Sequence, residues 1–232
     1  MLTAKGPLRR RPGVFMQAQT DAARFFDSFA DAFDSLYDSK RSFLMRWLDR
    51  TFRSDMFMRF ALSFESFGDL TGKTVLDIGC GSGPYVVEAL NRGAEWVTAV
   101  DPAPSMLALV RKRLDQAGLA ERCSLVEASF PGINLKAHDH AIIMGVMDYV
   151  PDARTFLAEL RPLVKVSAVL SFPSKHWLRT PLRKIRYRLR RCPVYFYDQA
   201  QINHLCSTAG FRTVNIYKIP GAGMDYHVCV KP

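Results

Sequence analysis

Glycine alternates with other residues in the segment Asp77-Ile-Gly-Cys-Gly-Ser-Gly83. The first of these glycines directly follows a short, mostly apolar run at 74–78. The apolar run is typical of a buried strand, and residues 84–91 are typical of a helix that Gly93 closes. Glycines permit a positive φ and let a ligand lie against bare backbone, while the start of a helix directs free N–H groups at an anion. A strand, a glycine loop and a helix in this order predict a cofactor site, which would suit nicotinamide or flavin groups among others.

The spacing of the glycines distinguishes between the classes of cofactor that such a loop can bind. A dinucleotide fingerprint reads G-x-G-x-x-G or ends in alanine, whereas counting from Gly79 brings Pro84 to the third position. The pattern here is D-x-G-x-G-x-G. It resembles motif I of the class I S-adenosylmethionine (SAM)-dependent methyltransferases, where the loop cradles the methionine moiety and ribose of SAM. The resemblance implies a cofactor site formed by Asp77, Gly79, Cys80, Gly81 and Gly83.

A second acidic residue, Asp101, closes the next predicted strand, at 96–100. An acid at the tip of this strand can accept hydrogen bonds from both ribose hydroxyls. The continuation Asp-Pro-Ala-Pro-Ser-Met106 resembles the D-x-S-x-x-M of the same family, which adds Pro102 and Met106 to the implied cofactor contacts. The alternative interpretation is an ordinary Rossmann-like unit with surface carboxylates.

The third predicted strand ends without an acid that this family often uses to bind the adenine amino group. The segment is Val126-Glu-Ala-Ser-Phe130, so Ser129 stands in the place of that acid. We therefore expect Ser129 and the backbone to bind adenine, with Phe130 packing on the ring.

The segment Met144-Gly-Val-Met-Asp-Tyr-Val-Pro151 follows the fourth predicted strand. In the family this segment passes beneath the sulfonium, which implies that Met144 and Tyr149 line the cofactor site, although Tyr149 also fits a core aromatic. The segment lacks the Asn/Asp-Pro-Pro-aromatic signature of enzymes that methylate amino groups of bases or glutamine. This absence counts against methylation of nucleic-acid nitrogen.

Methyl transfer from a sulfonium is an in-line displacement, and a hydroxyl acceptor must also lose a proton. The candidate catalytic bases are Asp148 and His176, with His204 less favoured. His176 follows the predicted strand at 166–172, at the edge where open α/β sheets bind ligands, but a surface or packed histidine is the alternative. No cluster has the spacing of metal ligands, and the five scattered cysteines form no C-x-x-C pair, so we predict neither a metal nor a disulfide framework.

The net charge of +10 comes from two short segments. Residues 1–14 and 179–191 carry basic side chains and no acidic one, and within the second segment residues 180–191 read as a basic amphipathic helix. This helix could rest on an anionic membrane, form a cationic lid over an acidic small molecule, or pack its leucines on the domain with a solvated basic face. RNA binding is disfavoured because few aromatic residues interleave the charges. The substrate contacts we predict are Tyr37, Arg183, Arg186 and Tyr197.

Strands and helices alternate from Gly72 onward, which predicts a doubly wound α/β sheet. The strands are expected at 74–78, 96–100, 123–126, 141–145, 166–172, 213–219 and 226–230, and the helices at 84–91, 104–116, 153–163 and 199–209. The family resemblance implies seven strands, of which the last is antiparallel. The expected organisation is a basic tail at 1–20, a helical lid at 21–70 and a SAM-binding domain at 71–232 with an insertion at about 174–198. The tail is interpreted as flexible, with an organelle transit peptide as the alternative.

The overall layout is similar to that of the ubiquinone-type and magnesium-protoporphyrin O-methyltransferases. It implies that a methyl group passes from SAM to an oxygen of an anionic or amphipathic small molecule. The alternatives are N- or C-methylation of a natural product or lipid headgroup, an RNA-binding or RNA-modifying protein, and a catalytically silent partner subunit. We expect a cytoplasmic protein, with peripheral contact to an anionic membrane as a variant of that expectation, and no oligomeric state is predicted.

Overall fold

The computed structural model of the protein describes residues 56–175, 194–220 and 225–232. Within these ranges one sheet has the strand order β3-β2-β1-β4-β5-β7-β6. The strands from β3 across to β5 are parallel, and β7 runs antiparallel to both β5 and β6. The predicted seven-stranded, mostly parallel sheet with an antiparallel last strand is therefore confirmed.

The strands lie close to the predicted ranges. They are β1 (Thr74–Ile78), β2 (Trp96–Asp101), β3 (Cys123–Glu127), β4 (His138–Ile143), β5 (Val164–Phe172), β6 (Thr213–Lys218) and β7 (Tyr226–Lys231). The helices are α4 (Pro84–Asn91), α5 (Pro104–Ala117), α6 (Ala153–Leu160) and α8 (Gln199–Thr208), with short 3-10 helices η1 (Ala120–Arg122) and η2 (Arg161–Leu163). Residues 56–67 are also helical.

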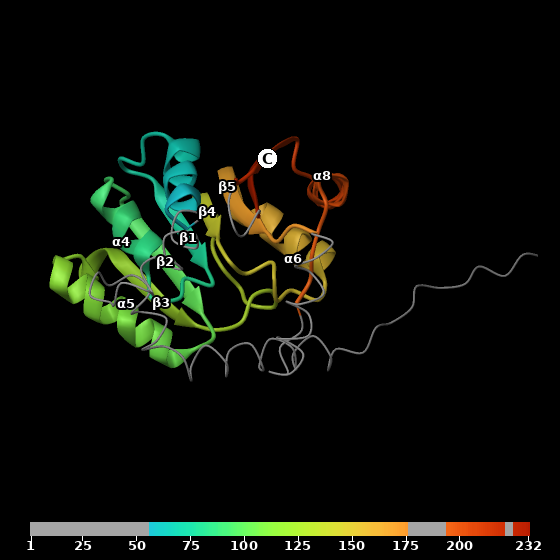
Figure 1. The fold of residues 1–232 in the computed structure, drawn as a ribbon. Helices are drawn as coiled ribbons and strands as arrows, with labels where there is room; N and C mark the ends of the chain where they lie inside the picture. Colours follow the sequence, from blue (N-terminus) through green and yellow to red (C-terminus); the bar gives the residue numbers. More distant parts are fainter. Residues whose placement is uncertain (1–55, 176–193, 221–224) are drawn as a thin grey trace, which may run out of the picture.

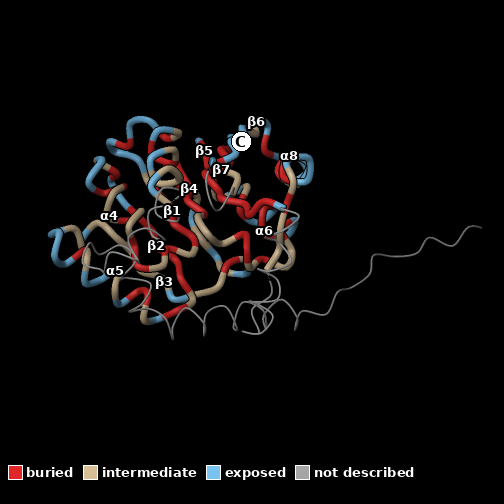
Figure 2. Tube along the Cα trace, viewed as in Figure 1, coloured by how far each residue is buried: buried red, intermediate tan, exposed pale blue. Residues whose placement is uncertain are grey.

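Two layers of helices cover the sheet. Helices α4 and α5 lie on one face, and α6 and α8 lie on the other (Figure 1). Helix 56–67 joins the α4–α5 side through Phe64 and Phe67, which belong to the same buried cluster as α4 and α5. Successive residues Val75 and Leu76 of β1 are fully buried on opposite faces, as expected for a parallel strand covered on both sides. Figure 2 shows this burial concentrated along the central strands.

Strand β4 and helix α6 differ from their predicted bounds. Strand β4 begins earlier than expected, at His138, because the Asp139 carboxylate accepts hydrogen bonds from the backbone N–H and the hydroxyl of Thr74 on β1, at 2.9 and 2.8 Å. It also ends earlier, because Gly145 adopts a φ of 74°. The predicted helix at 153–163 is α-helical only over α6 and changes to the 3-10 helix η2 over its last three residues. The change occurs because Pro162 has no N–H to donate to the preceding turn.

Polar side chains cap the N-termini of α6 and α8, the two helices on one face of the sheet. Asp152 is the N-cap of α6 and accepts a hydrogen bond of 3.2 Å from the Thr155 N–H. Asp198 and Gln201 form a capping box at the start of α8. No helix in the described ranges is both long and apolar enough to span a bilayer.

The predicted domain limits remain predictions. The basic tail at 1–20, most of the lid at 21–70 and most of the insertion at 174–198 lie outside the described residues. In the described part of the lid, residues 56–70, the helix covers residues 56–67.

Candidate cofactor site

The glycine loop joins the carboxyl end of β1 to α4 and is held against β2. The N–H groups of Gly79 and Cys80 both donate to the carbonyl of Val100, at 2.7 and 3.1 Å. Gly79 has a φ of 70°, and a Cβ on it would overlap the side chain of Val146. Glycine is therefore required here for two reasons, the left-handed backbone and the close approach of the chain that follows β4.

The last glycine of the loop, Gly83, allows α4 to start close to α5. Gly83 is the N-cap of α4 with a φ of 81°, and a Cβ on it would lie 2.9 Å from Cγ2 of Val110 in α5. Pro84 occupies the first turn of α4, where a missing N–H costs no hydrogen bond. The start of α4 is thus pressed against α5, with its free N–H groups at the glycine loop.

Asp101 connects the two loops at the ends of β1 and β2. Its Oδ2 accepts a hydrogen bond of 2.9 Å from the Gly81 N–H, and its Oδ1 accepts one of 2.9 Å from the Ala103 N–H. The side chain is buried, and burial raises the pKa of this carboxyl although both backbone N–H groups oppose the rise. Each oxygen has a second lone pair that can accept a hydrogen bond from a ligand hydroxyl.

Asp77 lies deeper in the same site. It is 2% exposed, and its Oδ2 is buried without a hydrogen-bond partner among the described residues. Burial, and then the nearby negative charge of Asp101, raise the pKa of Asp77 to about 8. A buried, unpaired carboxyl oxygen is costly unless a donor reaches it, so this position suits a ligand that carries an ammonium group. SAM has such a group in its methionine moiety and two hydroxyls on its ribose, and the acidic pair therefore fits SAM.

The segment after β4 runs along the glycine loop, since Val146 is the residue that a Cβ on Gly79 would meet. Ser171 near the end of β5 holds this segment by accepting a hydrogen bond of 2.7 Å from the Gly145 N–H. The carbonyl of Asp148 accepts a hydrogen bond of 2.9 Å from the Tyr195 N–H. Ser171 was missed by the sequence reasoning, because a serine inside an apolar strand has no local signal for this long-range role.

The structure places the other predicted cofactor residues at different depths. Met106 at the start of α5 is buried against Ala103, and Phe130 is buried in edge-to-face contact with Phe156, at 4.9 Å between ring centroids. Ser129, Pro102, Met144 and Tyr149 are half-buried. The buried Cys80 thiol has a raised pKa because of desolvation, which leaves it protonated and unreactive.

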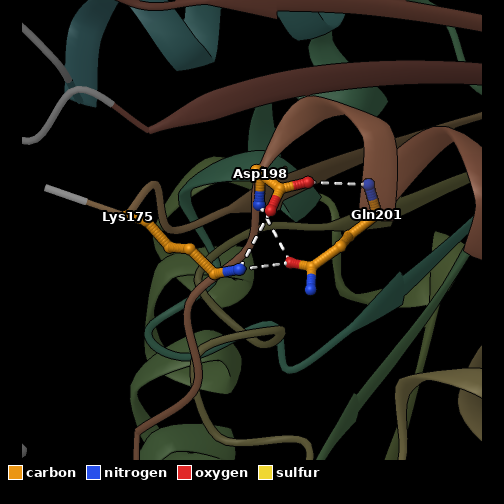
Figure 3. A network of polar contacts seen from close by, with 3 residues as sticks. All are labelled: Lys175, Asp198 and Gln201. Carbon is orange, nitrogen blue, oxygen red and sulfur yellow. Dashed lines mark hydrogen bonds and ion pairs between the residues drawn. The ribbon is translucent and has the colours of Figure 1, made fainter.

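The two ends of the insertion lie side by side. Ser174 and Tyr197 form a parallel bridge, and the Lys175 N–H donates to the carbonyl of Tyr197 at 3.1 Å. The Lys175 ammonium lies 2.9 Å from Asp198 Oδ2 and 2.8 Å from Gln201 Oε1, and so ties this junction to the start of α8 (Figure 3). The insertion is thus anchored next to the segment that follows β4.

Tyr197, which we predicted as a substrate contact, is buried in this junction. Its ring makes an edge-to-face contact with Phe172, with centroids 5.1 Å apart. Burial, and then the nearby Asp148 charge, raise the pKa of its hydroxyl. Asp148 itself is buried, while His204 is exposed on α8. His176, Tyr37, Arg183 and Arg186 lie outside the described residues. The described residues contain no group of three or more potential metal ligands.

Comparison with known proteins agrees with this geometry. Residues 75–167 match the methyltransferase-domain family. Over 178 residues the chain is 27% identical to a ubiquinone biosynthesis O-methyltransferase of Neisseria meningitidis, with 71% of this chain and 72% of that protein covered. It is 39% identical to a ribosomal protein L11 methyltransferase of Mannheimia succiniciproducens, over 30% of this chain and only 24% of the relative's length.

A crystal structure of magnesium protoporphyrin IX methyltransferase from Synechocystis with bound SAH has the same fold. The TM-score is 0.73 at 19% sequence identity, with 93% of this chain and 100% of that chain covered. The sheet order, the glycine loop and the family match together define a class I methyltransferase domain. The domain match, the similar relatives and the fold together support a SAM-dependent methyltransferase, and SAM is the cofactor of that class.

Proposed function

We propose that the protein transfers the methyl group of SAM to an oxygen of an anionic or amphipathic small molecule. The observation that carries the cofactor part is the buried acidic pair at the glycine loop, in which Asp77 Oδ2 has no partner among the described residues. The similarity to a ubiquinone biosynthesis O-methyltransferase supports an oxygen acceptor. The missing Asn/Asp-Pro-Pro-aromatic signature after β4 supports the same choice over nitrogen of a base or glutamine.

Different residues of the site bind different groups of SAM. Asp77 accepts the hydrogen bonds of an ammonium group, and the free lone pairs of Asp101 accept those of the ribose hydroxyls. The close contact of Gly79 with Val146 brings the segment after β4 against the loop. When bound, SAM supplies a methyl group on a positively charged sulfur. The chain's contribution is to orient the acceptor toward it and to shield the site from water.

Asp148 and His176 remain the proposed bases for an acceptor hydroxyl. Asp148 is buried at the foot of the insertion, and its backbone carbonyl holds Tyr195. Arg183 and Arg186 are proposed to bind an anionic group of the acceptor, because the clamped ends of the insertion bring the chain to this edge of the sheet.

Calorimetric titration of the full chain with SAM and with S-adenosylhomocysteine tests the cofactor part. We expect micromolar binding of both, followed by methylation of one class among quinols, porphyrins and lipid phenols in a screen. Folded protein that binds neither compound would refute the proposal and favour a silent partner subunit. Binding without methylation of any hydroxyl, but with methylation of an amine, would move the acceptor atom to nitrogen.

The basic insertion offers a separate test of membrane contact. Replacing the arginines at 183, 186, 188, 190 and 191 with glutamine should lower binding to vesicles that contain anionic lipid, by about 1 kcal/mol per charge at the surface. Sedimentation with neutral and anionic vesicles gives the comparison. Equal binding by the variant and the unchanged protein would exclude the insertion as a membrane contact and leave two alternatives, a cationic lid over the acceptor and a helix whose leucines pack on the domain.

A further inference from the structure

His227 lies at the carboxyl edge of the parallel strands, on the side of helix 56–67. It pairs with Ser171 of β5 in the antiparallel register of β5 and β7, and paired residues project on the same face of a sheet. The side chain is 4% exposed, and its Nδ1 has no hydrogen-bond partner among the described residues. The cofactor assignment above does not use this buried polar group.

The other ring nitrogen of His227 is held by helix 56–67. Its Nε2 lies 3.3 Å from the hydroxyl oxygen of Ser66, and that hydroxyl donates its one proton to the Leu62 carbonyl at 2.7 Å. Because the Ser66 proton is already used, Nε2 must be the donor in the contact with Ser66. The proton of the neutral imidazole is therefore on Nε2, and Nδ1 presents a bare lone pair.

Burial and a nearby positive charge keep the imidazole of His227 neutral. Arg59, two turns earlier on the same helix, forms an ion pair with Asp225 at 3.6 Å just before β7. Burial, and then the positive charge of Arg59, lower the pKa of His227 to about 4. A neutral ring with a free lone pair accepts a hydrogen bond at neutral pH and does not donate one from Nδ1.

A short series of contacts connects this histidine to the cofactor loop. Ser171, its cross-strand partner, holds the Gly145 N–H at 2.7 Å, and the next residue, Val146, lies against Gly79. Neighbouring strands are spaced by about 4.8 Å, so the start of β7, where His227 lies, is roughly 10 Å from the end of β4. That places His227 on the β5 side of the methyl-transfer position, where an acceptor and not the cofactor would lie.

We propose that Nδ1 of His227 binds and orients the acceptor by accepting a hydrogen bond from its hydroxyl group. The assignment rests on the proposed function, since it presumes an acceptor with an O–H group next to the bound cofactor. It makes Ser66 a positioning residue, because the Ser66 hydroxyl selects the tautomer that leaves Nδ1 free. An acceptor whose hydroxyls are all methylated lacks the donor that this nitrogen requires.

The test uses the full chain labelled with ¹⁵N and the imidazole resonances of His227, assigned with the His227→Gln variant. At neutral pH we expect the proton on Nε2, and we expect catechol, a small phenol used as probe, to shift the Nδ1 resonance. 1,2-Dimethoxybenzene, which has the same ring and no O–H, should leave the resonance in place. A proton on Nδ1, equal shifts with both compounds, or no shift at millimolar catechol would overturn the proposal.

Two variants distinguish the role of Nδ1 of His227 from that of Nε2. His227→Gln keeps an amide N–H near the position of Nε2 and removes the Nδ1 acceptor, whereas His227→Asn keeps an acceptor near Nδ1 and loses the contact with Ser66. We expect His227→Gln to weaken catechol binding roughly tenfold and His227→Asn to weaken it less. The opposite order would overturn the assignment of Nδ1.

Further controls separate this proposal from the proposed function. In Ser66→Ala the tautomer preference should disappear from the ¹⁵N spectrum, while the pattern of a folded protein is kept. SAM titration of the His227 variants should give the affinity of the unchanged protein. Absence of SAM binding by the unchanged protein would contradict the proposed function alone, whereas catechol binding that is equally tight in His227→Gln would contradict the present proposal alone.

Discussion

Oδ2 of Asp101, at the end of β2, accepts a hydrogen bond of 2.9 Å from the N–H of Gly81 in the loop that follows β1. The same carboxylate holds the Ala103 N–H at the start of α5. One side chain therefore fixes the relative position of the two loops of the candidate cofactor site.

Replacing Asp101 with alanine should weaken SAM binding by about 1.5–3 kcal/mol, because both the ribose contact and the support of the loop are lost. Calorimetric titration measures the change. Glu127→Ala is the matched control, since Glu127 is the exposed acid that pairs with Asp101 in the register of β2 and β3. An unchanged affinity in Asp101→Ala would contradict the ribose assignment.

SAM binding should release protons from Asp77. The pKa of this buried carboxyl is raised to about 8, so it is mostly protonated at pH 7 in the free protein, and an arriving ammonium group should lower the pKa. The affinity for SAM should accordingly rise between about pH 6 and pH 8. Titration in two buffers of different ionisation enthalpy measures the released proton, and Asp77→Asn should abolish most of the difference. A binding enthalpy that does not depend on the buffer would contradict the assignment.

The contact of Gly79 with Val146 should make Gly79→Ala more destabilising than its backbone angle alone explains. Gly118 is the matched control, because it has a similar φ of 68° but no atom within 4 Å of an added Cβ. Gly118→Ala should cost about 1–2 kcal/mol of unfolding free energy, the cost of a left-handed residue with a Cβ. Denaturant unfolding should show a larger loss for Gly79→Ala, which the second substitution Val146→Ala partly restores. Equal losses at the two glycines would argue against the overlap.

His227 should make the fold sensitive to acid. Its pKa is lowered to about 4 in the folded protein against roughly 6.5 for an unfolded histidine, so the unfolded chain binds more protons between these values. The contribution of His227 to stability is therefore complete above about pH 7 and is lost as the pH falls toward 4. The difference in melting temperature between the unchanged protein and His227→Gln should shrink over that range. Buried His138 and His140, whose pKa values are also lowered, are present in both proteins and cancel. A difference that stays constant from pH 7 to pH 4 would contradict this account.

The sequence by itself determined most of the strands and helices and the glycine loop between β1 and α4. Apolar runs and closing glycines are local signals, so β1 and α4 have the predicted bounds. The spacing of Asp77, the glycines and Asp101 is also a local signal, since these residues lie at or shortly after the carboxyl ends of β1 and β2. These features depend on backbone geometry within a few residues, which the order of residue types reveals.

Only the tertiary structure decided which distant residues meet. Ser171 holds Gly145, and the Ser66 hydroxyl selects the tautomer of His227, a residue 161 positions away in the chain. The early start of β4 likewise depends on Asp139 reaching Thr74 on another strand. Such contacts depend on strand order, register and helix placement, and many sequences with the same local pattern would differ in them. For this reason the cofactor loop could be predicted from spacing, whereas the candidate acceptor-binding histidine appeared only when β5, β7 and helix 56–67 were brought together.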